Sequence, residues 1–408
     1  MVGRSISLRR IIPLIWAVVL GLGMSSERQA AGVAGEQAVT ISILEESAER
    51  TVVHYEFGDF KRRGISINGQ TFTGIHLGGE SLKKEKGSPA LPDVSRSIII
   101  PDDARMEVRV LDSSHYEITD IDIVPSKGYI LRTVNPADVP YTFGKAYEMD
   151  ALYPGPLATL RQPYIMRDHR GIVVTANPFQ YNPVRRQLRV YNYMMVEVEL
   201  VGKGEVNVMK RQEGRKRSLS RSFHDIYSSH FLNYSAGGGY APLGDPPDPP
   251  DEEGEMLIIT HDTWISNLQP LVNHKNNIGI NTTVVSVSTI GNNHEDIKDY
   301  IQGVYDTNDL AFVLLVGDIN EVDSPIVYID EQPELSPLSD PTYSKLAGND
   351  DYPDIIVGRF SAQTAADVNT QVERTIEYET MPAVQQAWFW RGIGIGSSEG
   401  PGDANEYD

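Results

Sequence analysis

The feature that most constrains the fold is an uninterrupted apolar run, AFVLLV at residues 311–316, which ends in Gly317 and Asp318. Such a run is typical of a strand buried on both faces, as in a parallel sheet covered by helices. In open α/β sheets the carboxyl ends of the strands carry binding and reaction sites, so Asp318 could present a carboxylate there. A competing interpretation is that Gly317 and Asp318 only turn the chain and cap a helix.

The residues around this run alternate between short apolar strands and segments of helical periodicity. The expected strands are 256–260, 282–287, 355–360 and 392–398, and the expected helices are 261–277, 294–305 and 362–378. Alternation of this kind predicts a doubly wound, mostly parallel α/β sheet over residues 256–408. We expect this domain to be truncated, because the sequence stops soon after its last predicted strand.

The N-terminal half has a different pattern, in which short strands are separated by turns. Expected strands are 51–57, 64–67, 96–100, 106–111, 172–175, 188–190 and 196–200. In MMVEVEL, residues 194–200, apolar residues alternate with Glu197 and Glu199, which places both glutamates on the face away from the core. The pattern predicts an all-β, sandwich-like domain over residues 39–235.

A segment rich in proline, glycine and acidic residues, 236–255, separates the two halves and is typical of an extended linker. Before it, residues 210–221 form a basic patch in an otherwise acidic chain. This patch indicates an exposed segment open to trypsin-like proteases, with Arg211, Arg217 and Arg221 as candidate processing sites. A solvated run of charges is the other interpretation.

The first residues resemble a secretory signal peptide, predicted to span 1–31. Arg4, Arg9 and Arg10 precede an apolar run at 11–24, and small residues follow. The run is too short to favour a membrane span, and an uncleaved signal anchor is the alternative. The segment predicts a secreted protein, extracellular or on the cell surface.

Composition excludes some functions. Acidic residues outnumber basic ones, 56 to 36, which argues against a nucleic-acid partner because phosphate binding needs a basic face. The chain contains no cysteine, so these residues form no disulfide, thiolate metal site or cysteine nucleophile.

Two acidic segments are candidate sites. Residues 349–354, NDDYPD, group hard oxygen ligands of the kind that Ca²⁺ takes, although solvated loop acids would look the same and the spacing is not that of an EF-hand. Glu399 follows the predicted strand 392–398, where it could orient a histidine or hold a cation.

Several ordered motifs resemble the gingipain-type cysteine endopeptidases. The first half of their catalytic domain is similar to FVLLVGD, GNDDYPDIIVGRFS, QVERTIEYE and IGIGSSEGPGDANEYD, and their propeptide is similar to GSPALP, IIIP, YPG and PFQYNP. The resemblance implies a secreted zymogen in which a caspase-like α/β domain is held inactive by its own propeptide. It also implies attack of a cysteine thiolate on protein or peptide substrates, with a histidine oriented by an acid.

The resemblance assigns roles to individual residues. Glu399 would be the orienting acid and Asp408 the carboxylate of the specificity pocket, with Glu406 as a rival, so specificity for arginine or lysine stays open. Asp350, the carbonyl of Tyr352 and Asp354 would form a structural calcium site. The basic run would be the maturation site.

The family's catalytic histidine and cysteine do not stand in these 408 residues. We therefore expect the sequence to be the N-terminal part of a longer precursor, inactive by itself. The alternative is a secreted, noncatalytic adhesion or binding protein with a degenerate peptidase-like domain.

Overall fold

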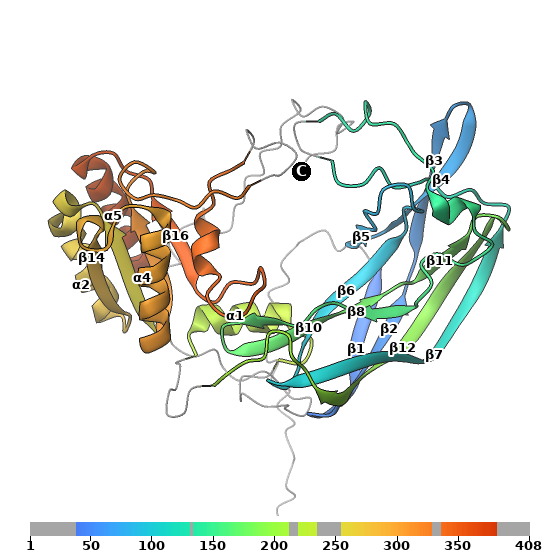
Figure 1. Cartoon of the computed structure of the whole chain (residues 1–408), viewed down its shortest axis with the longest axis horizontal. Coiled ribbons are helices and arrows are strands. Elements are labelled where there is room, and N and C mark those ends of the chain that lie inside the picture. Colours follow the sequence, from blue (N-terminus) through green and yellow to red (C-terminus); the bar gives the residue numbers. More distant parts are fainter. Residues whose placement is uncertain (1–37, 131–133, 212–218, 235–253, 329–335, 382–408) are drawn as a thin grey trace, which may run out of the picture. The chain divides into compact units, whose positions relative to one another are not determined.

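The computed structural model describes residues 38–130, 134–211, 219–234, 254–328 and 336–381. In the C-terminal part, four parallel strands pair in the order β14-β13-β15-β16 (Figure 1). Their bounds are β13 Glu255–Thr260, β14 Asn281–Ser286, β15 Leu310–Val316 and β16 Ile356–Phe360. The predicted strands at 256–260, 282–287, 311–316 and 355–360 are confirmed to within two residues, whereas 392–398 lies outside the described residues.

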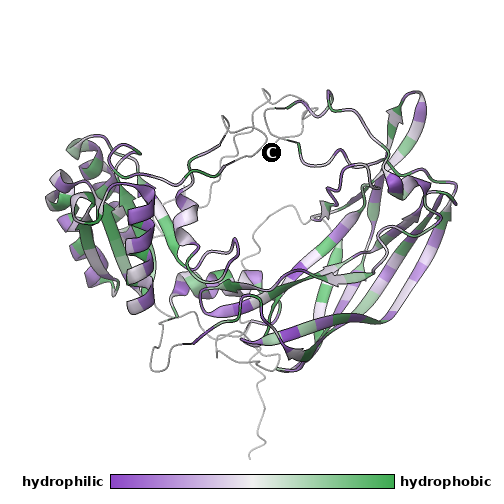
Figure 2. Cartoon of the chain, viewed as in Figure 1, coloured by the Kyte–Doolittle hydropathy of each residue, from purple (hydrophilic) through white to green (hydrophobic). Residues whose placement is uncertain are grey.

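Helices cover both faces of this sheet. Val313 and Leu315 share one core with α4, His294–Thr307, while Val316 shares another with α5, Ala365–Thr380. In Figure 2 the strands are hydrophobic, and hydrophilic residues recur along the helices. The expectation that the 311–316 strand is buried on both faces is confirmed.

The helices differ slightly from the predicted ranges. Residues 261–277 form a 3-10 helix, η2 Asp262–Leu268, followed by α2 Gln269–Asn277, which has a proline in its first turn. Proline lacks an N–H and is favoured in the first turn, so a new helix begins there. Two further short helices are α3, Val287–Ile290, and η4, Asp340–Ser344. Thr364 and Asp367 form a capping box at the start of α5.

The N-terminal part is built from two five-stranded sheets whose strands supply one shared core. The first has the order β1-β2-β12-β11, with β7 also pairing β12; the second has the order β5-β6-β10-β8, with β9 also pairing β10. The strands of the first sheet are β1 Val39–Glu46, β2 Arg50–Phe57, β7 Ala104–Thr119, β11 Phe179–Asn182 and β12 Gln187–Lys203. Those of the second are β5 Ser81–Leu82, β6 Pro92–Ile99, β8 Ala158–Leu160, β9 Tyr164–Met166 and β10 His169–Ala176.

A separate hairpin joins β3, Phe60–Ile67, to β4, Gln70–Leu77. Its turn residues Asn68 and Gly69 have φ angles of 50° and 84°, as an Asn-Gly turn between two strands requires.

Two details of this part differ from the sequence prediction. Residues 188–190 and 196–200 belong to one long strand, β12, which carries register shifts that let it bend while pairing β7. Glu197 lies on the face away from the core, as the alternation in 194–200 predicts, but it is buried there, because Arg50 and Arg109 from the two neighbouring strands reach over it.

The prediction of an all-β domain over 39–235 leaves out two helices, η1 Lys145–Glu148 and α1 Arg221–His230. Helix α1 begins at Ser220, whose hydroxyl accepts from the N–H of Phe223 at 3.3 Å. Its residues Phe223 and Tyr227 are buried one turn apart. Within the described ranges, no helix has the length and apolar character needed to cross a membrane.

Candidate functional site

The four parallel strands end at a common edge, where Gly317 and Asp318 follow β15. Gly317 has a φ of 143°, and its N–H donates to the carbonyl of Phe360 at 2.9 Å. The carboxylate of Asp318 accepts from Gln363 at 2.9 Å and from the N–H of Ile319 at 3.0 Å, and the Gln363 hydrogen bond is the main cause of its lowered pKa. These contacts are the ones expected if Gly317 and Asp318 turn the chain.

Arg359 in β16 braces the loop that follows this turn. Its guanidinium donates two hydrogen bonds to Asp340, both 2.7 Å, and one each to the carbonyls of Gly317 and Val322, both 2.8 Å. Arg359 was not among the residues predicted from the sequence, where its only signal was a charge inside an otherwise apolar strand. Arg359 therefore stabilises the conformation of the loop at the carboxyl edge of the sheet.

The predicted calcium residues lie in the loop before β16, and Asp354 is its most enclosed member. Its side chain is completely buried. One carboxylate oxygen accepts from the N–H of Arg167 at 2.8 Å, and the other accepts from the N–H groups of Leu346 and Ala347 at 2.8 and 2.7 Å. Burial raises the pKa of Asp354 to about 6.

Asp350 and Tyr352 contact the hairpin that β9 and β10 form in the N-terminal part, called the hairpin from here on. One carboxylate oxygen of Asp350 accepts from the N–H of Ile165 at 2.9 Å, and the other accepts from the N–H of Tyr352 at 3.0 Å. Burial raises the pKa of Asp350. The ring of Tyr352 stacks on the ring of Tyr164. The structure thus brings these loop residues together with strand β9.

Arg167 occupies the turn between β9 and β10, and its side chain is completely buried. Its guanidinium donates to the carbonyl of Leu310 and pairs with Asp309 at 2.9 Å, while it lies 4.6 Å from the ring centre of Phe223. Burying an arginine is tolerated where acceptors meet most of its donors. Among the described residues, the Nε of Arg167 has no hydrogen-bond partner, but it lies 3.4 Å from the carboxylate of Asp168. Nothing in the local sequence pointed to Arg167, because its hydrogen-bond partners Asp309, Leu310 and Asp354 are more than a hundred residues away.

The position of Arg167 relative to the sheet follows from these contacts. Leu310 begins β15, and Asp354 lies just before β16, so the hairpin meets the amino ends of both strands. Gly317 and Asp318 lie at the opposite ends. The hairpin therefore contacts the edge of the sheet away from the one at which α/β proteins bind their ligands.

The hydrogen bonds of the 349–354 loop determine whether its carboxylates are available to bind calcium. No group of three or more histidine, cysteine and acidic side chains gathers in the parts of the chain that the structure describes, but the predicted site needs only two carboxylates and a carbonyl. Both carboxylates face N–H donors, whose partial positive charge opposes a cation at the same oxygens. The residues do not fit calcium while the hairpin occupies them, and calcium binding stays a prediction.

Among the candidate processing residues, Arg211 pairs with Asp102 at 2.6 Å and also donates to the carbonyl of Asp168 at 3.1 Å. Arg221 is exposed at the first position of α1. Arg217 lies outside the described residues, as do Glu399 and Asp408. The three calcium candidates therefore lie in one described loop, whereas the catalytic and specificity candidates lie outside the described residues.

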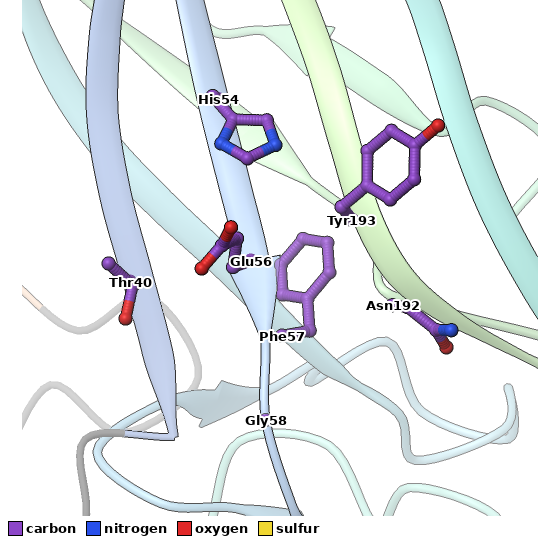
Figure 3. A pocket seen from close by; sticks show the side chains of 7 residues that line it. All are labelled: Thr40, His54, Glu56, Phe57, Gly58, Asn192 and Tyr193. Carbon is purple, nitrogen blue, oxygen red and sulfur yellow. The ribbon is translucent and has the colours of Figure 1, made fainter.

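Figure 3 shows an open hollow of about 430 Å³ on the first N-terminal sheet, lined by Thr40, His54, Glu56, Phe57, Gly58, Asn192 and Tyr193. His54 and Tyr193 lie on the neighbouring strands β2 and β12, with ring centres 5.9 Å apart. None of the predicted site residues lines this hollow.

Comparison with known proteins matches both halves of the chain. The family model described as Propeptide_C25 matches residues 34–239, and the model described as Peptidase family C25 matches residues 249–407. Gingipain R2 of Porphyromonas gingivalis is 36% identical over 320 residues, which are 78% of this chain and 41% of that protein. Lys-gingipain of the same species is 24% identical over 391 residues, 92% of this chain and 22% of that protein.

A solved structure, the complex of Porphyromonas gingivalis RgpB pro- and mature domains, has 34% sequence identity and a TM-score of 0.43. The match covers 48% of this chain and 97% of that one. The chain belongs to the C25 peptidase family, with the family's propeptide ahead of its peptidase segment. The resemblance inferred from the motifs is confirmed. The chain spans less than half the length of the curated relatives given above.

Proposed function

We propose that this chain is the N-terminal part of a secreted cysteine endopeptidase zymogen, in which the propeptide keeps the peptidase domain inactive. The observation that carries the proposal is the buried contact of Arg167 with Asp309, Leu310 and Asp354. Arg167 lies in the segment matched by the propeptide model, and its partners lie in the segment matched by the peptidase model. Such a contact is what an intramolecular inhibitor needs to stay bound.

The proposed reaction is hydrolysis of peptide bonds in protein or peptide substrates. A cysteine thiolate would attack the carbonyl carbon, and a histidine would carry the proton to the leaving amine. The sequence contains no cysteine, so the nucleophile must come from outside these 408 residues. Glu399 would orient the histidine, and we propose a caspase-like arrangement of the parallel sheet around it.

Specificity for a basic side chain before the scissile bond would come from Asp408, because a carboxylate pairs with arginine or lysine. Glu406 is the rival for this role. A solved gingipain R is titled an Arg specific cysteine proteinase, and Lys-gingipain carries lysine in its name. This chain is 36% identical to Gingipain R2 and 24% identical to Lys-gingipain. We propose arginine as the preferred residue.

Maturation would require cleavage in the basic segment. Arg217 is the preferred position, because cleavage after Arg211 would require release of its pair with Asp102, and cleavage after Arg221 would require unwinding of α1. The N-terminal segment supports export to the cell surface or medium. Calcium would bind the 349–354 loop once the hairpin has left it.

The proposal is tested by expressing the full-length protein and measuring hydrolysis of peptides with arginine, lysine or alanine before the cleaved bond. We expect thiol-dependent cleavage after arginine, lost on Glu399→Gln and on Asp408→Asn, with Glu406→Gln as the matched control for the second. Absence of any thiol-dependent hydrolysis by the processed protein would favour a secreted binding protein instead. Intact linkage across residues 189–256 in active protein would contradict the zymogen part.

A further inference from the structure

The hollow in Figure 3 is built by residues that lie side by side on three strands. Antiparallel pairing places Glu56 of β2 between Thr40 of β1 and Tyr193 of β12. Tyr55 packs into the core of the N-terminal part, so the alternation of the strand turns Glu56 to the opposite face, where it is exposed. The hollow therefore opens on the face of the first sheet that lies away from the core.

An irregularity of β12 adds a further side chain to the hollow. Tyr191 and Tyr193 pair consecutive residues of β7, which leaves Asn192 between them as the extra residue of a bulge. Bulges are frequent next to functional sites, where they re-aim a side chain. Asn192 is exposed and lines the hollow from the same strand as Tyr193 (Figure 3).

The polar groups of the hollow are free to meet a ligand. Within the described ranges, no hydrogen bond or ion pair engages the carboxylate of Glu56 or the side-chain amide of Asn192. No lysine or arginine is among the described residues that line the hollow. A carboxylate without a neighbouring cation gives the hollow a negative potential, which favours a positively charged ligand.

Tyr193 supplies an aromatic surface beside this carboxylate. Its ring lies 5.9 Å from the ring of His54, and the two planes are inclined by 47°. Its hydroxyl donates to the carboxylate of Asp112 at 2.8 Å, which brings a second negative charge close to the ring. The face of a tyrosine ring attracts a cation, and the charge of Asp112 adds to that attraction.

We propose that this hollow binds the side chain of an arginine in a basic peptide. The planar guanidinium would stack on Tyr193, form a two-pronged pair with Glu56 and donate to the amide oxygen of Asn192. The volume of about 430 Å³ falls in the range of pockets that hold small ligands, so the neighbours of the arginine also have room. The proposal goes beyond the proposed function and does not rest on it, since none of the predicted site residues lines the hollow.

Calorimetric titration of the 408-residue chain with the capped tripeptide Gly-Arg-Gly tests the need for a charge. The chain contains no cysteine nucleophile that could consume the peptide. We expect the same peptide with citrulline, a neutral isostere of arginine, to bind about tenfold more weakly, because a hydrogen bond to a charged group is lost. Equal affinity for the two peptides, or no binding of the arginine peptide, would overturn the proposal. Binding of methyl glucoside in its place would assign the hollow to a sugar and would also overturn it.

A variant pair locates the binding. Glu56→Gln keeps the shape of the side chain and removes its charge, so it should weaken binding of the arginine peptide by about tenfold. Its thermal unfolding should stay that of wild type, because Glu56 is exposed. Glu107→Gln is the matched control and should bind as wild type does, since Glu107 is an exposed carboxylate of the same sheet outside the hollow. Unchanged affinity in Glu56→Gln would contradict the proposal.

A third variant separates this site from the specificity pocket proposed above. Asp408→Asn should leave binding of the arginine peptide unchanged. Binding that is lost in Asp408→Asn but kept in Glu56→Gln would overturn the site in the hollow and support the specificity part of the proposed function. Binding that is lost in Glu56→Gln alone would confirm the hollow, whatever the peptidase assay of the full-length protein gives.

Discussion

The rings of Tyr164 and Tyr352 are stacked, with centroids 3.5 Å apart and planes inclined by 12°. One tyrosine belongs to strand β9 of the propeptide segment and the other to the acidic loop of the peptidase segment. The hydroxyl of Tyr164 also lies 2.7 Å from Nε2 of His230 in α1. Aromatic side chains from helix α1, the β9–β10 hairpin and the 349–354 loop thus pack together as one cluster.

We expect Tyr164 and Tyr352 to be energetically coupled. In a double-mutant cycle of Tyr164→Leu and Tyr352→Leu, measured by urea unfolding, the coupling free energy should be about 1 kcal/mol, as for other aromatic pairs. Tyr164→Phe keeps the stacked ring and removes only the hydroxyl, so it isolates the contribution of His230. Additive effects of the two leucine substitutions would show that the stacking contributes nothing.

Arg170 should be far more important for stability than its place in a β-strand suggests. Its buried guanidinium donates to the carbonyls of Pro101, Ala104, Val206 and Asn207, and so ties two loops to β10. Arg170→Met leaves those carbonyls without donors and should lower the free energy of unfolding by about 3 kcal/mol or more.

Arg185→Met is the control for Arg170, because Arg185 pairs with Asp150 while both side chains are more than half exposed. An exposed ion pair contributes little to stability, so this variant should be close to wild type in thermal or urea unfolding. Equal destabilisation by the two variants would contradict the role assigned to Arg170.

His169 should make the protein less stable in acid. Burial among the rings of Tyr227, Phe231 and Tyr234 lowers its pKa from 6.5 to about 4, although Asp168 and Asp102 oppose this and Arg211 adds to it. The unfolded chain binds the proton near pH 6.5 and the folded chain only near pH 4, so stability falls as the pH drops through this window. The loss from this group should approach about 3 kcal/mol at pH 4.

Urea unfolding of wild type and His169→Phe between pH 4 and 7 measures this contribution. The variant keeps an aromatic ring and removes the titrating group. The excess of the free energy of unfolding of wild type over that of the variant should therefore shrink or reverse as the pH falls. Parallel pH profiles would show that His169 does not titrate as expected. His230, whose pKa is also lowered by burial, acts in the same direction and stays present in both proteins.

Gly317 should not tolerate a side chain. It has a φ of 143°, and a Cβ there would lie 2.6 Å from Cβ of Glu321. Gly317→Ala should therefore lower the free energy of unfolding by about 2 kcal/mol, through backbone strain and displacement of the following loop. Gly358→Ala, in the neighbouring strand, meets nothing within 4 Å and should be neutral in the same thermal unfolding assay.

The α/β half could be predicted well because its signals are local. An uninterrupted apolar run specifies a strand buried on both faces, and helical periodicity specifies the stripe that covers it, so β15, α4 and α5 follow from short stretches of sequence. The resemblance of ordered motifs to the C25 family also needed no structure, and the comparisons confirm it.

The burial of Glu197 and the helix α1 could not be predicted in this way. A glutamate alternating with valines is expected in water, and only pairing of β12 with β2 and β7 brings Arg50 and Arg109 over it. Helix α1 has a mixed polar sequence, and the burial of Phe223 and Tyr227 against the hairpin accounts for its stability.

The sequence alone determined which residues could be acidic ligands, which segment is basic and which family the chain resembles, because these depend on residue type and order. Tertiary structure decided which partner the acids of the 349–354 loop meet. Arg167 and Asp354 are 187 residues apart, and only the folding of β9 and β10 onto the amino ends of β15 and β16 places an N–H at that carboxylate. Contacts between residues so far apart in sequence leave no pattern in the local sequence. Each of the two residues can adopt its own backbone conformation without contacting the other.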